Sequence, residues 1–198
     1  MTRDVSDIAA LLGSRICHDL ISPLGAISNG VELLPLSGDT SPEIELIAES
    51  ISNANARVRF FRVAFGAAGP DQRIGASEVH SILAALGQGG RLTIDWKDSS
   101  DAPRRDVKLA FLMIQCLEAA MPWGGRITAS RDNDRWTVAG QAERMKINTG
   151  LWEVLSRPDA DVDVGAADVQ FLMAPQMIRD TGRALTLEIS ETAITARF

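Results

Sequence analysis

The first third of the chain carries two long stripes of apolar residues at helical spacing. In each stripe the apolar residues recur every three or four positions, which is typical of an amphipathic helix. Between the stripes, residues 37–41 read Ser-Gly-Asp-Thr-Ser, and Ser41 followed by Pro42 is a favourable helix start. The pattern predicts an antiparallel helical hairpin. The stripe residues are Ile8, Leu12, Ile16, Leu20, Leu24, Ile27, Val31 and Leu34, then Ile44, Ile47, Ile51, Ala54, Val58, Phe61 and Phe65.

A two-helix hairpin with a full apolar stripe on each helix cannot bury both stripes by itself. Pairing with a second copy about a two-fold axis would bury them in a four-helix bundle. The alternative is that the C-terminal half covers the stripes within one chain. Because the stripes run over many turns, we expect a homodimer.

The sequence changes character at residues 66–71, where Gly-Ala-Ala-Gly-Pro-Asp indicates a boundary between a domain at 1–68 and a domain at 72–198. Beyond it, helical patterns alternate with short strand-like runs. This order predicts an α/β sandwich with helices on one face of a sheet, and therefore an α+β chain. The expected helices span 76–88, 105–120 and 165–181, and the expected strands span 91–96, 126–131, 136–140, 184–189 and 193–198.

Composition narrows the class of protein. The 20 basic residues against 26 acidic residues give a net charge of −6, which argues against sequence-independent binding to nucleic acid or to anionic membranes. No run approaches the roughly 20 apolar residues of a membrane span, and the first residues show no export signal. The two cysteines, Cys17 and Cys116, make neither a disulfide framework nor a metal site. We therefore expect a cytoplasmic protein that binds no metal.

The chain has two histidines, and His18 lies on the face of the first helix opposite the apolar stripe. That face is small and polar, and an exposed neutral imidazole there offers a ring nitrogen as a nucleophile. Pro23, about one turn further on, is unfavourable in the interior of a helix. Such a defect close to an exposed histidine favours a functional site. His80 is interpreted as an ordinary surface histidine. The residues sharing the face of His18 are Ser14, Ser22, Gly25 and Asn29, with Ile21 and Ala26 at its edge.

The string His18-Asp-Leu-Ile-Ser-Pro-Leu24 resembles the phosphoacceptor box of two-component sensor histidine kinases, and every fixed position of that box is met. The resemblance implies that His18 carries a phosphoryl group. It also implies that Asp19 orients the ring or takes its proton, and that Ser22 faces the phosphoryl site. Arg15 would offset phosphoryl charge. For Asp19 and Arg15, an ordinary solvated side chain is the alternative.

Residues 109–129 and 172–198 are similar to the ATP-binding module of the same kinases, the GHKL (Bergerat) fold. The nucleotide-binding asparagine of that module falls at or near Cys116. After the strand at 136–140, the segment 141–150 lacks both the Asp-x-Gly-x-Gly motif and a glycine cluster for phosphates. The resemblance therefore implies a degenerate α/β sandwich that holds no ATP and needs no cofactor.

A phosphoacceptor hairpin joined to a degenerate ATPase module resembles the ChpT-type histidine phosphotransferases of alphaproteobacteria. This implies a homodimer that relays phosphoryl groups between receiver domains, those of response regulators and of a hybrid sensor kinase, with Mg²⁺ held by the receiver. The receivers would dock over Ile21, Gly25 and Asn29. Asn53 and Arg57 of the second, antiparallel helix would line the same site. An ATP-using kinase fragment or phosphatase, and a non-catalytic dimeric adaptor that docks receivers, are the alternatives.

Overall fold

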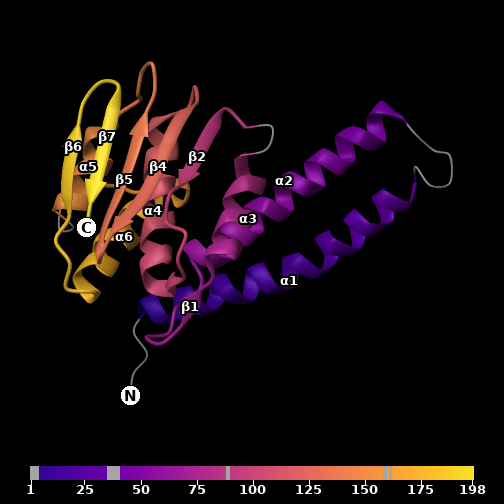
Figure 1. Ribbon diagram of the computed structural model, residues 1–198, viewed down its shortest axis with the longest axis horizontal. Helices are drawn as coiled ribbons and strands as arrows, with labels where there is room; N and C mark the ends of the chain where they lie inside the picture. The colour runs from indigo at the N-terminus through magenta and orange to yellow at the C-terminus, as the bar shows by residue number, and fades with distance from the viewer. Residues whose placement is uncertain (1–4, 35–40, 88–89, 158–159, 161) are drawn as a thin grey trace.

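The computed structural model describes residues 5–34, 41–87, 90–157, 160 and 162–198. Helix α1 (Val5–Leu33) and helix α2 (Pro42–Ala64) form the predicted hairpin, which projects from the rest of the molecule as an arm (Figure 1). Ser41 caps α2, since its hydroxyl oxygen accepts the N–H of Ile44 at 3.4 Å. Helix α1 continues through Pro23. The predicted turn at 37–40 lies outside the described residues.

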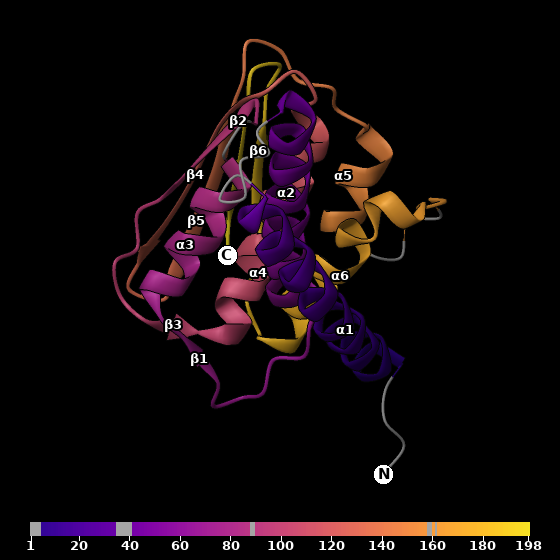
Figure 2. The ribbon, with the colours of Figure 1, turned by 90° about the vertical axis from the view of Figure 1, so that its right-hand side faces the viewer.

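A mixed five-stranded sheet forms the second part of the molecule. Its order is β2 (Leu92–Trp96), β4 (Gly125–Asp132), β5 (Arg135–Gln141), β7 (Ala193–Arg197) and β6 (Thr186–Ile189). Strands β2 and β4 are parallel, and all other pairs are antiparallel. The helices lie on one face of this sheet (Figure 2), which confirms the predicted α+β class. Two short strands, β1 (Arg73–Ile74) and β3 (Ala102–Pro103), pair separately.

The helices of this part follow the prediction with two differences. Helices α3 (Ala76–Gly87) and α4 (Arg104–Ala120) lie where their patterns placed them, as far as residue 87 for α3. The helix expected at 165–181 is split into a 3₁₀ turn, η2 (Ala166–Asp168), and α6 (Gln170–Asp180). Helix α5 (Thr149–Ser156) was not predicted.

Helix α4 is the centre of the core. Its residues from Asp106 to Leu117 are all buried, as expected of a helix that is covered on every side. It contacts α2, α6 and the sheet. The ring of Phe111 stacks on Phe60 of α2, with centroids 4.6 Å apart and planes 9° from parallel. The last turns of α2 therefore belong to the same core as the sheet.

The connection after α2 is held by three cations at the start of α4. Arg104, Arg105 and Lys108 donate hydrogen bonds to carbonyl oxygens between residues 62 and 68, the shortest being 2.7 Å from Lys108 Nζ to Gly66 O. Cations suit this place because the last carbonyl groups of a helix lack partners within the helix. Burial lowers the pKa of Lys108 to about 8. The segment predicted as a boundary is thus tightly bound to α4.

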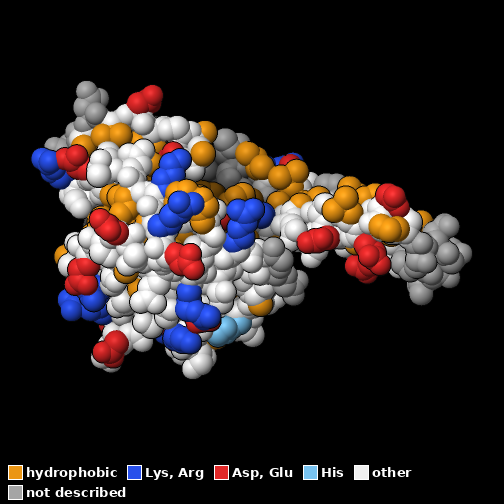
Figure 3. Space-filling model, turned by 90° about the horizontal axis from the view of Figure 1, so that it is seen from above, with side chains coloured by type: hydrophobic (Ala, Val, Ile, Leu, Met, Phe, Trp, Pro, Cys, Tyr) orange, Lys and Arg blue, Asp and Glu red, His pale blue; other side chains and the backbone are white. Residues whose placement is uncertain are grey.

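The apolar stripe of α1 is largely uncovered. Helix α1 faces α2 through Cys17, which is buried, whereas four stripe residues remain exposed: Ile16, Leu20, Ile27 and Leu34. Ile47 on α2 is exposed as well, whereas Ile51 is buried inside the single chain. Apolar side chains follow the arm in Figure 3. At these exposed positions the C-terminal half does not cover the stripe.

Candidate functional site

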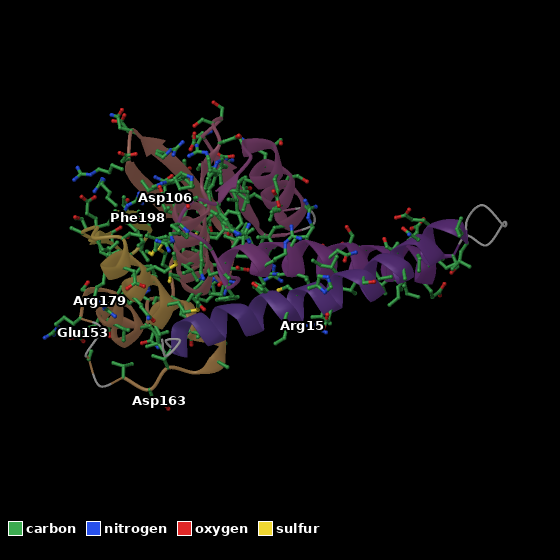
Figure 4. All side chains as sticks on the ribbon, turned by 90° about the horizontal axis from the view of Figure 1, so that it is seen from below. Arg15, Asp106, Glu153, Asp163, Arg179 and Phe198 are labelled. Carbon is green, nitrogen blue, oxygen red and sulfur yellow. The ribbon has the colours of Figure 1, made fainter. Side chains whose placement is uncertain are left out.

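His18 lies on the exposed face of α1, and 83% of its side chain is accessible. Its Nδ1 atom is 3.0 Å from Oδ1 of Asp19. The other oxygen of the Asp19 carboxylate accepts a hydrogen bond from Arg15 Nε at 2.6 Å. Arg15, one turn earlier, points outward from α1 (Figure 4). The helix therefore places an arginine, a carboxylate and an imidazole in one chain of contacts.

The carboxylate at the centre of this chain is held ionised. The hydrogen bond with His18, followed by the hydrogen bond from Arg15, lowers the pKa of Asp19 below its usual value. An ionised carboxylate accepts a hydrogen bond from Nδ1–H and so favours the imidazole tautomer with its hydrogen on that atom. In this tautomer Nε2 keeps its lone pair and faces solvent. An exposed ion pair adds little to the free energy of folding, and here it lies directly against the Nδ1 side of the ring.

Beyond His18, α1 carries a track of small residues formed by Ser22, Gly25 and Asn29. Ser22 and Asn29 are exposed, and Ile21 and Gly25 are half-buried. A methyl group added at Gly25 would meet no atom within 4 Å. Ser14, which the helical pattern placed on the same face, is turned instead toward the end of α2, where its hydroxyl accepts the N–H of Ala67 at 2.9 Å.

Asn53 and Arg57 of α2, both expected to line the docking site, differ in their contacts. Asn53 is exposed on α2, so it stays a candidate for partner binding. Arg57 forms a two-point ion pair with Glu118 of α4, at 2.7 and 3.2 Å. The structure therefore ties Arg57 to the second part of the molecule. Sequence reasoning missed Glu118, because the 61 residues that separate the pair leave no local signal.

The residue at or near the position of the kinase asparagine belongs to the apolar core. Cys116, at or near the position of the kinase asparagine, is fully buried in α4. Burial, followed by the charge of Asp168, raises the pKa of its thiol. Two aromatic rings of α5 and α6, Trp152 and Phe171, pack edge to face at 5.4 Å within the same apolar core.

Two further features bear on what the chain binds. In the described ranges, no group of three or more His, Cys, Asp or Glu side chains is placed to hold a metal ion. Within the same ranges, the helices are too short or too polar to cross a bilayer.

Comparison with known sequences identifies relatives over most of the chain. Residues 76–193 match the family described as histidine phosphotransferase C-terminal domain. The protein phosphotransferase ChpT of Brucella abortus (strain 2308) is 30% identical over 193 residues, which cover 94% of this chain and 92% of that protein.

Similar chains also occur among solved structures. A bacterial phosphotransferase whose structure is known at 1.7 Å is 26% identical, with a TM-score of 0.70, and the match covers 100% of this chain and 98% of that one. A histidine kinase domain of a blue-light-activated kinase from Erythrobacter litoralis has 14% identity and a TM-score of 0.45, covering 93% and 90% of the two chains. With a family match over more than half of its length and a relative at 30% identity, the chain belongs to the histidine phosphotransferase family and is a homologue of the protein phosphotransferase ChpT.

Proposed function

We propose that this protein is a cytoplasmic phosphorelay enzyme that moves phosphoryl groups between receiver-domain aspartates through His18. The partners are response-regulator receivers and the receiver of a hybrid sensor kinase. One observation carries the proposal: the imidazole of His18 is open to solvent while Asp19 holds its Nδ1 side. A partner can therefore reach Nε2 without any movement of α1.

The reaction balances with the groups present. Nε2 attacks the phosphorus of an aspartyl phosphate in line, an N–P bond forms, and the P–O bond to the receiver breaks, releasing its carboxylate. The phosphorylated imidazole then carries positive charge and a proton on Nδ1, which the ionised Asp19 stabilises. A second receiver takes the phosphoryl group when its aspartate oxygen attacks and the N–P bond breaks, returning the neutral ring. Mg²⁺ would be held by the receiver.

Labelled receivers test this proposal directly. A receiver carrying a radioactive aspartyl phosphate should label His18 in an acid-labile form, and an unlabelled second receiver should then remove the label. A chain that binds receivers but never becomes labelled would be a docking adaptor, and the relay would be excluded.

Mg-ATP is not expected to bind, because the chain lacks the residues that hold the nucleotide in the kinases. Cys116 offers a buried thiol in place of the asparagine, and residues 141–150 supply no glycine-rich phosphate loop. Millimolar Mg-ATP should leave the thermal midpoint unchanged, since only a ligand that binds the folded state raises it. A saturable rise of several degrees in a thermal scan would instead support the kinase or phosphatase alternative.

A homodimeric four-helix bundle is the second part of the proposal. It is supported by the exposed stripe on α1, whose Leu20 and Ile27 are 45% and 50% accessible. On a helical wheel these side chains lie about 160° to 180° from His18, so a bundle would leave the phosphoryl site open.

Ile27→Glu should convert the protein to a monomer, because burying an unpaired carboxylate in the bundle costs several kcal/mol. The side chain is exposed in the single chain, so the fold should survive. Ala26→Glu, at an exposed position outside the stripe, is the control and should leave the dimer intact. Sedimentation at micromolar concentration measures the oligomeric state of both variants. If the unsubstituted protein is itself a monomer, the bundle is excluded.

A further inference from the structure

A cleft of about 370 Å³ lies at the root of the arm, where α2, α3, α4 and the parallel strand pair meet. This volume is in the range of small-molecule sites, and such sites often form where two parts of a fold join. Apolar side chains make up most of its lining, and Figure 3 shows Lys and Arg side chains beside apolar ones on this side of the molecule. The apolar lining comes from Leu86, Leu92, Ile94, Ile114, Met121 and Ile127.

The cleft is distinct from the degenerate nucleotide site. Both border α4, but Ile114 and Glu118 line the cleft and lie about 160° around the helix from Cys116. The phosphoryl site is also separate, because none of the lining residues belongs to α1. The function proposed for His18 therefore does not account for the cleft.

Among the described charged side chains that line the cleft, one positive charge is not neutralised by an ion pair. Arg57 and Glu118 neutralise each other through their two-point ion pair. Arg91, at the lip, has no ion-pair partner among the described residues. Its backbone is fixed, because Gly125 N–H donates to Arg91 O at 3.1 Å and the positive φ of Gly124, 99°, brings the chains close. A Cβ at Gly124 would lie 2.4 Å from Arg91 O.

We propose that this cleft binds a small amphipathic monoanion, with the apolar body against the lining and a carboxylate at Arg91. A single uncompensated cation matches a single negative charge, and a guanidinium binds a carboxylate through paired hydrogen bonds. An apolar lining of this size accepts a short alkyl chain or one aromatic ring.

Calorimetric titration with octanoate, at concentrations where octanoate is monomeric, tests the proposal on the whole 198-residue chain without any receiver. Octanoate should bind saturably, and its affinity should fall about tenfold or more in Arg91→Gln through loss of a charge-assisted hydrogen bond. Arg135→Gln, at an exposed position on β5, is the matched control and should bind as the unsubstituted protein does. In amide NMR spectra the shifts should centre on β2 and on the end of α4.

The head group provides a second test that needs no substitution. Octanol and octylammonium carry the same chain with no negative charge, so both should bind at least about tenfold more weakly than octanoate. Equal binding of octanol and octanoate, octanoate affinity unchanged in Arg91→Gln, or absence of saturable binding would each overturn the proposal. Because no phosphoryl group is involved, its failure would leave the relay function untouched.

Discussion

Replacing His18 with alanine is expected to abolish phosphoryl exchange while receiver binding persists. The substitution removes the nucleophile itself, and no other described residue offers an open imidazole beside a carboxylate. Docking should survive because Ser22, Gly25 and Asn29 form the track that we expect receivers to cover. Radiolabel transfer between two receivers measures the first effect, and calorimetry with an unphosphorylated receiver measures the second.

His80→Ala is the matched control for this experiment. His80 is also exposed, on α3, and no carboxylate contact with its ring is present among the described residues. Exchange should therefore proceed at the unsubstituted rate. Exchange retained in His18→Ala, or lost in His80→Ala, would move the phosphoryl carrier away from α1.

The contacts between Arg15, Asp19 and His18 were predictable because they are local. Arg15, His18 and Asp19 lie within five residues on one helix, where a fixed rotation per residue sets which side chains meet. The hairpin was predictable for a related reason, since apolar residues that keep helical spacing over many turns fit few structures besides an amphipathic helix.

Other features depend on contacts that no short stretch of sequence encodes. The pair Arg57–Glu118 joins two helices far apart in the chain, so no local signal indicated that Arg57, expected to line the receiver-docking site, would bind α4. Strands β1 and β3 have two residues each, too few to show alternation. Helix α5 did carry a signal, the Asn148 cap before apolar Leu151 and Trp152. That signal is weak because the helix has only eight residues.

The expected docking of receivers along α1 leads to a second prediction with a large effect, on the rate of phosphoryl exchange. Gly25→Trp should slow phosphoryl exchange by orders of magnitude, because displacing reacting groups by about 1 Å can cost roughly a hundredfold. The fold should survive, since a Cβ at Gly25 meets no atom within 4 Å and the residue lies on the outer face of α1. Gly25 lies only about 20° around α1 from His18, so an indole there stands in the path of a helix approaching the imidazole. Single-turnover transfer from a phosphorylated receiver measures the rate.

Two controls separate obstruction from a general effect of substituting a helix glycine. Gly25→Ala fills the same position with one methyl group and should exchange at close to the unsubstituted rate. Gly30→Trp introduces the same indole where an added Cβ also meets no atom within 4 Å, about 120° around the helix from His18, and should slow exchange far less. Equal rates in Gly25→Trp and Gly30→Trp would show that receivers approach His18 from another direction. Slow exchange in all three variants would point to a requirement for glycine in the helix backbone. Only slow exchange confined to Gly25→Trp places the receiver on this track.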